Sequence, residues 1–225
     1  MIALGRMLKV TPVHKFGART GITSGAEHTI WDGDGVYPWT SFTTSGILDV
    51  TGASDAGKSI VISGLDDNYD EISETIAVGA SSTLQFKRVF RAYVQGNGST
   101  NVGDISVAIS GTEVLKISAD KGQTLMAVYT VPRNCTGLLQ CWETSASADK
   151  DMLVELYTRE SENDPFRIQH VGNVYRNQYS YEFATPLALP AGSDIDVRVI
   201  GYNNDNNARV ACSFDIINYE EDTDY

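Results

Sequence analysis

The sequence predicts an all-β protein, built from antiparallel β-sandwich or jelly-roll-like modules with an extended N-terminal arm. The first observation is a series of short runs after about residue 46 in which apolar and polar residues alternate. The second is the set of Gly, Asn and Asp clusters that separate these runs at hairpin-like spacings. The third is that no long window repeats with the helical period of about 3.6 residues.

Residues 1–45 have no sustained period and are predicted to form the extended arm. Pro12 and Gly17 interrupt this segment, as residues of turns and irregular structure do. Disordered tracts are depleted in aromatic residues, so this aromatic segment needs a surface to lie on, either its own domain or a neighbouring subunit. The interface candidates are its large aromatic side chains, Trp31, Tyr37, Trp39 and Phe42.

The runs that follow the arm are predicted as strands. They cover residues 47–50, 59–63, 72–78, 84–94, 104–109, 114–117, 125–131, 137–142, 152–157, 166–170, 179–183, 195–200 and 209–216. One small sandwich needs fewer strands, so we expect a first β module at 46–120 and a second β-sandwich module at 121–219. An acidic tail follows at 220–225, and a single elongated jelly-roll-like sandwich is the alternative.

Residues 194–199 show the alternation most clearly. Ile195, Val197 and Val199 fall on one face of the expected strand, and the charged residues of the run fall on the other. The apolar face is expected in the core, and the charged face is expected to meet solvent. Substituting Arg198 is therefore expected to be mild.

Composition excludes several classes of protein. Hydrophobic residues make up 42% of the 225 residues, which is not the composition of a disordered chain. The net charge of −12 argues against nucleic acid as a partner, because phosphates recruit an excess of Lys and Arg. No stretch reaches the roughly 18 apolar residues of a membrane span, so no membrane association is expected.

The termini and cysteines indicate where the chain is made. The first residues lack the charged start and apolar run of a signal peptide. Cys135, Cys141 and Cys212 are few and odd in number, which fits a reducing cytosol better than a disulfide-stapled secreted domain. We therefore expect synthesis in a host cytoplasm.

Residues 52–59, Gly-Ala-Ser-Asp-Ala-Gly-Lys-Ser, match the G-x4-G-K-S pattern of a phosphate-binding loop. Such a loop acts through backbone N–H groups and the N-terminus of a helix that follows. Here residues 60–65 are largely β-branched and end in a turn, so no such helix is expected. We interpret the match as a glycine-rich hairpin loop.

Asp66, Asn68 and Asp70 place oxygen atoms at alternate positions, as a calcium-binding loop does. The sixth loop position should be Gly and is Glu71, and the twelfth should be Glu and is Ala77. A hairpin turn capped by these side chains is the preferred interpretation. A weak divalent-ion site is the alternative.

No catalytic, cofactor-binding or metal-binding residue is assigned. His14, His28 and His170 are far apart and lie in no zinc-binding frame. No Gly-x-Ser-x-Gly elbow is present, although a Ser/His/Asp or Cys/His site that assembles only in space stays open. We expect a non-enzymatic protein without a cofactor.

Four segments of the sequence resemble those of a known protein family. They stand in this order at residues 64–75, 90–94, 101–105 and 122–132. They resemble a family of virion structural proteins of tailed phages, especially marine ones, over roughly residues 15–218. The resemblance implies membership of a particle and an all-β fold, without any catalytic residue. Arg133 and Asn134 stand where such proteins often have Ala-Gly, so that turn is expected to differ.

We therefore expect a structural protein of a tailed-phage virion, with head decoration or cementing ahead of a place in the neck or tail. A receptor- or glycan-binding module of the tail, which would use exposed Trp and Tyr, is the alternative. The expected partners are other virion proteins, such as the major capsid or neck and tail proteins, and further copies of this chain.

Overall fold

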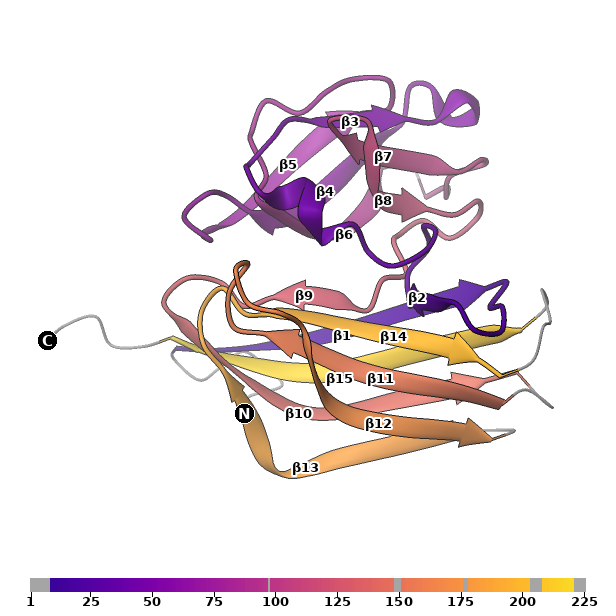
Figure 1. The fold of residues 1–225 in the computed structure, drawn as a ribbon. Helices are drawn as coiled ribbons and strands as arrows, with labels where there is room; N and C mark the ends of the chain where they lie inside the picture. The colour runs from indigo at the N-terminus through magenta and orange to yellow at the C-terminus, as the bar shows by residue number, and fades with distance from the viewer. Residues whose placement is uncertain (1–8, 97, 148–150, 176–177, 203–207, 221–225) are drawn as a thin grey trace, which may run out of the picture. The chain divides into compact units, whose positions relative to one another are not determined.

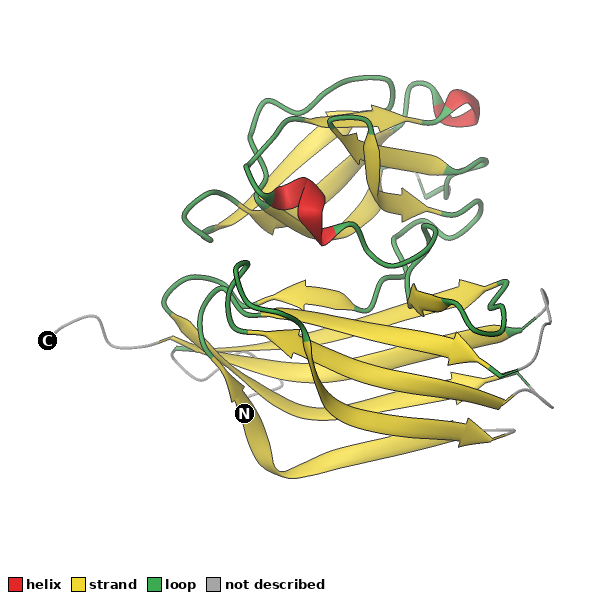
Figure 2. Cartoon of the chain, in the orientation of Figure 1, coloured by secondary structure: helices red, strands yellow, loops and turns green. Residues whose placement is uncertain are grey.

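A computed structural model describes residues 9–96, 98–147, 151–175, 178–202 and 208–220. The chain divides into two compact units, which can be followed in Figure 1. Residues 31–126 form the inserted unit, and residues 1–30 together with 127–225 form the split unit. Figure 2 shows that strands dominate both units and pair in antiparallel sheets, which confirms the predicted fold class.

The split unit is built from two sheets. Its strands are β1 (Val10–Thr20), β2 (Glu27–Thr29), β9 (Val128–Thr130), β10 (Cys135–Ala146), β11 (Asp151–Arg159), β12 (Arg167–Tyr175), β13 (Gln178–Leu189), β14 (Asp194–Gly201) and β15 (Arg209–Glu220). Sheet 1 has the order β1-β15-β10-β13. Sheet 2 has the order β12-β11-β14, with β2 and β9 both paired to the remaining edge of β14.

β2 and β9 together act as one interrupted strand. They pair with opposite ends of β14 in continuous antiparallel register. Between them, the N–H of Ile30 donates to the carbonyl of Val197 at 2.8 Å, and the N–H of Val197 donates to the carbonyl of Ala127 at 3.2 Å. The N–H of Ala127 also donates to the carbonyl of Ile30 at 2.9 Å. The inserted unit thus leaves and re-enters the strand opposite a single residue.

Strand pairing in the split unit is nested. With β2 and β9 counted as one strand, the first strand pairs with the last (β1 with β15) and the second with the next to last (the interrupted strand with β14). Inside these, β10 pairs with β13 and β11 with β12. Two four-stranded sheets connected in this way form a jelly roll, so the predicted jelly-roll-like module is confirmed for this unit.

The described part of the predicted arm, residues 9–45, is not an arm. β1 pairs along its whole length with β15. Pro12 and Gly17, which indicated irregular structure, both fit this strand. Pro12 is tolerated because β1 is an edge strand of sheet 1. Gly17 is required because a Cβ atom there would lie only 2.4 Å from the carbonyl oxygen of Ile30. Residues 1–8 lie outside the described residues.

The predicted module boundaries at 46–120 and 121–219 also differ from the observed units. The reason is that β1 and β2 complete the two sheets of the split unit, while residues 31–45 contribute aromatic side chains to the core of the inserted unit. Of the predicted acidic tail, Glu220 ends β15 and residues 221–225 lie outside the described residues.

The inserted unit contains two three-stranded sheets, with the orders β3-β7-β8 and β5-β4-β6. Its elements are the 3-10 turns η2 (Trp39–Phe42) and η3 (Ala53–Asp55) and the strands β3 (Leu48–Thr51), β4 (Ser59–Leu65), β5 (Glu71–Ala77), β6 (Arg88–Gln95), β7 (Ile105–Ile109) and β8 (Thr112–Ile117). Every strand segment predicted from the alternating runs overlaps an observed strand.

On β14 the predicted apolar face is confirmed as core, whereas the prediction that the charged face meets solvent is wrong. Ile195, Val197 and Val199 are each 0% exposed, as expected of the core face. Asp194 and Asp196, on the face expected to meet solvent, are also 0% exposed. Buried carboxylates require compensating charge, which comes from Arg159 of the neighbouring β11 and from Arg198 of β14 itself.

Candidate interaction surface

The outer face of sheet 1 is the side that points away from sheet 2. On β15 the residues at alternate positions from Val210 to Asn218 are buried, and those between them are exposed or half-buried. Because paired residues of neighbouring strands lie side by side, the outer residues form rows across the sheet. The apolar row consists of Pro12, Ile217, Leu138 and Ala188. The mixed row consists of His14, Asp215, Cys141 and Glu182.

The mixed row brings a histidine and a cysteine to the same carboxylate. His14 Nδ1 lies 2.5 Å from Asp215 Oδ1, and the Cys141 thiol donates to Asp215 Oδ2 at 3.6 Å. Burial and the adjacent negative charge of Asp215 raise the pKa of Cys141. A nucleophilic cysteine needs a lowered pKa and a base to take its proton. This thiol instead stays protonated, so the geometry is not that of a Cys/His catalytic pair.

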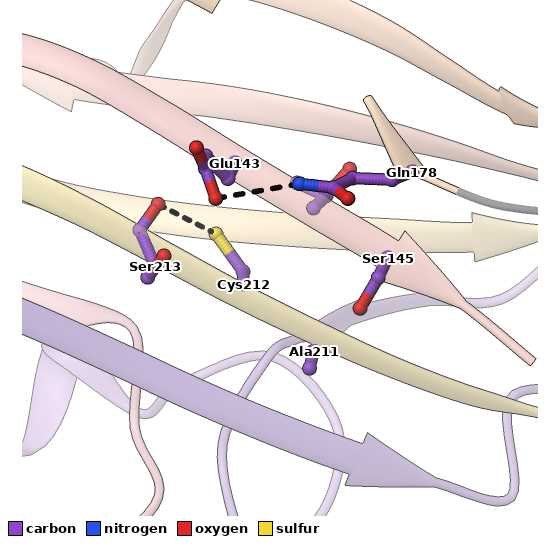
Figure 3. Close-up of a pocket in the computed structure, with 7 residues that line it drawn as sticks. Glu143, Ser145, Gln178, Ala211, Cys212 and Ser213 are labelled. Atoms are coloured by element: carbon purple, nitrogen blue, oxygen red, sulfur yellow. Dashed lines mark hydrogen bonds between the residues drawn. The ribbon is translucent and has the colours of Figure 1, made fainter. Parts of the chain in front are cut away.

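A shallow hollow of about 190 Å³ lies on the same sheet, across β10, β13 and β15 (Figure 3). Gln178 Nε2 donates to Glu143 Oε2 at 3.4 Å along its rim. Ser145, Ala211 and Ser213 are small side chains beside them. A hollow with small side chains and few charges is suited to receiving a side chain of another protein.

The interface candidates predicted from the sequence lie in the interior of the inserted unit. Trp31 and Tyr37 are each 2% exposed, Trp39 is 8% exposed and Phe42 is 0% exposed. The Tyr37 ring centroid lies 5.2 Å from that of Trp31 and 4.8 Å from that of Trp39. The Arg88 guanidinium lies 5.8 Å from the Trp39 ring and 5.9 Å from the Phe42 ring. These aromatic side chains are core, and their prediction as a free interface is corrected.

Two arginines form ion pairs with the buried carboxylates of β14. Arg159 Nη2 lies 2.7 Å from Asp194 Oδ2, and Arg198 Nε lies 2.8 Å from Asp196 Oδ2. The ring of Phe166 lies 4.7 Å from the Arg159 guanidinium carbon and 5.0 Å from that of Arg198. Each buried carboxylate is therefore neutralised in place, which suits a structural role.

The phosphate-loop match has none of the geometry of such a loop. Strand β4 follows Lys58 where a phosphate loop requires a helix. Lys58 Nζ lies 2.9 Å from Asp55 Oδ1 and also donates to the carbonyl of Thr100. A hollow of about 420 Å³ adjoins this lysine, but the ammonium group is already paired with a carboxylate.

The Asp66 turn between β4 and β5 has the expected capping. Asp66 Oδ1 accepts the N–H of Asn68 at 2.8 Å and that of Asp70 at 3.0 Å. Among the described residues, no three His, Cys, Asp or Glu side chains gather closely enough to hold a metal ion. In the same part of the chain, none of the helical segments has the length and apolar character of a membrane span.

No family model matches the chain, and no curated protein matches it. Distantly similar solved structures include two from infectious bursal disease virus. The VP2 subviral particle of infectious bursal disease virus has 9% identity and a TM-score of 0.24, over 93% of this chain and 72% of that chain. A structure of the Gx strain of that virus has 9% identity and a TM-score of 0.22, over 96% of this chain and 77% of that chain. Likenesses this distant carry no argument about function.

The sequence predicts the strands that form the outer face, but it does not show how their outward residues combine into one surface. Its rows join residues of β1, β15, β10 and β13, which are far apart in the chain. Only the register of the sheet brings them together. The alternation in 209–216 was the one available signal, because it separates inward from outward positions on β15.

Proposed function

We propose that the chain is a non-enzymatic structural subunit of a tailed-phage particle, held in place through the outer face of sheet 1. A head decoration or cement protein is the preferred role, ahead of a neck or tail subunit. The observation that carries this proposal is the uncharged apolar row on a chain with a net charge of −12. An outward sheet face normally carries polar side chains, and a contiguous apolar patch marks a place where proteins associate.

Two further observations support this role. Phe16 and Tyr219, on the same face, are 36% and 45% exposed, and aromatic side chains are enriched in protein interfaces. Jelly rolls occur in viral capsid proteins, lectins and cupins, so the fold is compatible with the role without requiring it. Four sequence segments resemble virion structural proteins of tailed phages, and this resemblance is the reason for proposing a phage particle as the place of assembly.

The alternative, a receptor- or glycan-binding module, has less support. Trp31, Trp39 and Trp142 are 2%, 8% and 0% exposed, so no tryptophan is available as a stacking platform for a sugar. Exposed tyrosines such as Tyr175, at 64%, are left for that purpose. Saturable binding of a glycan, lost on substitution of such a tyrosine, would favour this alternative.

Particles of the virus that encodes the chain provide the test. Ala211 is exposed in the hollow of the outer face, and Thr112 is exposed on β8 of the inserted unit. We expect Ala211→Arg to lower incorporation into particles by about tenfold or more, as blocking a central contact does, with an unchanged melting curve. Thr112→Arg is the matched control and should incorporate normally. Mass spectrometry of purified particles measures both. Particles that lack the protein, or normal incorporation of Ala211→Arg, would contradict the proposal.

A further inference from the structure

Strand β12 forms one edge of sheet 2. Among the described strands it pairs only with β11, so the backbone groups along its other side meet no strand of this part of the chain. Its side chains Ile168, Val171 and Tyr175 are 48%, 43% and 64% exposed. The β11 residues that pair with them alternate with core residues, so all three lie on the outer face of sheet 2, away from sheet 1. An edge of this kind can receive a further strand.

The two edge strands of sheet 1 carry residues that hinder such an addition. β1 contains Pro12 and Lys15, and β13 contains Glu182 and Pro186. A proline removes a backbone donor, and charged side chains on an edge oppose pairing with another chain. Residues 168–175 of β12 contain no proline and no Asp, Glu, Lys or Arg. Of these three long edges, β12 is therefore the one suited to pairing.

The charge of β12 allows a second copy of the chain to be the added strand. Each chain has a net charge of −12, so two copies repel each other unless they meet where acids are absent. Arg167, at one end of β12, is its only Asp, Glu, Lys or Arg residue. Burial lowers the pKa of His170, which keeps this side chain neutral at pH 7. Two copies of β12 can therefore lie side by side without bringing their acids together.

A bulge limits where a second copy can pair. The register between β12 and β11 shifts by one residue at Gln169, which has no paired residue on β11. The regular stretch from Val171 to Tyr175 has Asn173 at its centre. A copy related by a two-fold axis at Asn173 runs antiparallel to β12 and places its own Tyr175 opposite Val171. Aromatic and β-branched residues that lie opposite each other on one face stabilise an antiparallel pair.

We propose that the β12 strands of two copies pair in antiparallel fashion about a two-fold axis at Asn173, which joins the two copies of sheet 2 into one continuous sheet. Asn173 then faces its counterpart, and each carboxamide supplies both a donor and an acceptor for the other. On either side of the axis, Val171 of one copy contacts Tyr175 of the other. The outer face of sheet 1 takes no part in this pairing and stays free. The inference goes beyond the proposed function and does not depend on it.

Charge substitutions at the axis test the pairing. We expect sedimentation velocity to show a concentration-dependent dimer, and Asn173→Lys to raise its Kd at least ~10-fold, because like charges directly opposite each other destabilise a strand pair. An equal mixture of Asn173→Lys and Asn173→Asp should restore the dimer, since opposite charges then face each other. Ser180→Lys, at an exposed position on β13, is the matched control and should dimerise as the unaltered chain does.

Disulfide formation tests the register. The background is Cys141→Ser, because the other two cysteines are buried. In this background, Asn173→Cys should form a covalent dimer at least ~10-fold faster than Ser180→Cys, since only the axis brings two equivalent Cβ atoms near the roughly 3.5–4.5 Å separation of a disulfide.

Four results would overturn the proposal. The first is a chain that stays monomeric at every concentration, and the second is a dimer whose Kd Asn173→Lys leaves unchanged. The third is a mixture of the two charge variants that restores no dimer, and the fourth is an equal rate of disulfide formation at positions 173 and 180. A photoreactive side chain at position 173 that crosslinks only to a different virion protein in particles would overturn it as well, because another strand would then occupy the edge.

Discussion

The two units differ in how far along the chain their strands must reach to pair. The inserted unit is one continuous stretch, residues 31–126, and its strands β4, β5 and β6 follow one another. The split unit must bring the two ends of the chain together, because β1 pairs with β15. Local contacts form at a lower entropic cost than distant ones. The difference implies that the inserted unit can fold by itself, whereas the split unit depends on both chain ends.

The units also bury charge in different ways. In the split unit, Arg198 joins Asp196 of its own strand to Glu27 of β2, at 2.8 and 2.9 Å. In the inserted unit, Asp55 is 1% exposed and accepts the N–H groups of Val102 and Gly103 at 2.8 and 2.9 Å. The first arrangement consists of side-chain charges, whereas backbone N–H groups together with a lysine three residues away stabilise the second. The first is therefore the more vulnerable to a single substitution.

Excising the inserted unit tests directly whether the two units fold independently, and it should change thermal unfolding more than any other variant proposed below. Because the N–H of Ala127 lies 2.9 Å from the carbonyl oxygen of Ile30, a linker of about three Gly or Ser residues can join these two residues. We expect the joined chain to keep a cooperative melt of its own, since the interrupted strand becomes continuous. Residues 31–126 expressed alone should give a second, separate transition. Calorimetry measures both.

The outcome that contradicts this comparison is equally definite. If the joined chain loses its cooperative melt while residues 31–126 keep theirs, the jelly roll depends on the inserted unit. If residues 31–126 fail to fold alone, the two units are one cooperative structure, and the difference in sequence separation has no thermodynamic consequence.

Arg198→Ser should have the next largest effect, in the split unit alone. The substitution leaves Asp196, which is 0% exposed, without its guanidinium, and it also removes the pair with Glu27. Removing one partner of a buried ion pair costs about 3–5 kcal/mol. The mild effect expected from the alternating pattern is thus replaced by a severe one. Denaturant midpoints measure it, with Arg167→Ser, an exposed position on β12, as the control within about 0.5 kcal/mol. Equal midpoints for the two variants would show that the Arg198 pairs contribute little.

The sequence predicts strands well where alternation is the dominant signal, as in 72–78 and 194–199. It fails at β1 because Pro12 and Gly17 are breakers only in the interior of a sheet. On an edge strand Pro12 is harmless, and Gly17 serves the close approach of a second backbone. The sequence does not predict the interrupted strand, for a different reason. β2 and β9 are each only three residues long, and their continuity exists solely in their common partner β14.

The candidate surface lies beyond what pattern alone can predict. Aromatic content singled out Trp31, Tyr37, Trp39 and Phe42, yet a cluster of aromatic side chains serves a small core as readily as an interface. The apolar row contains no aromatic residue, and its members are distributed over four strands. Burial within one unit and register across strands decide between core and surface, and neither can be read from local sequence.

Lys58→Ala should have a moderate effect, confined to the inserted unit. The lysine of the phosphate-loop pattern pairs with Asp55, whose side chain is 0% exposed. Burial alone would raise the pKa of Asp55, but the N–H groups of Val102 and Gly103, together with Lys58, lower it below its ordinary value. The backbone donors remain in the variant, so we expect a loss of about 1–3 kcal/mol, against about 0.5 kcal/mol or less for the exposed control Lys121→Ala. A loss no greater than that of the control would mean that the backbone donors alone hold Asp55.

Asp32→Asn should have the smallest effect and the opposite sign. Burial raises the pKa of Asp32 to about 6, although the N–H of Leu125 donates to it at 2.8 Å and the Ser118 hydroxyl donates at 3.0 Å. Lys116 lowers this pKa further and Asp104 raises it, both as smaller contributions. A raised pKa means that the folded unit binds the proton more tightly than the unfolded chain. The stability that Asp32 contributes is therefore complete below its ordinary pKa of 3.8 and is lost as the pH rises through about 6.

An asparagine at this position accepts the N–H of Leu125 and donates to Ser118 without carrying a charge at any pH. We expect Asp32→Asn to raise the stability of the inserted unit at pH 8 by about 1 kcal/mol, a value reduced for the partial exposure of the group, and to leave it nearly unchanged at pH 4. For a unit of this size that is a rise in Tm of about 4–8 °C. Asp55 and Glu74 have lowered pKa values, so their contributions change only at more acidic pH and do not obscure this window. Melting curves of both proteins from pH 4 to pH 8 measure the difference, which should open between pH 4 and 7. If the two proteins instead diverge only below pH 4, or the variant is the less stable at pH 8, then hydrogen bonding outweighs desolvation at Asp32, as it does at Asp55.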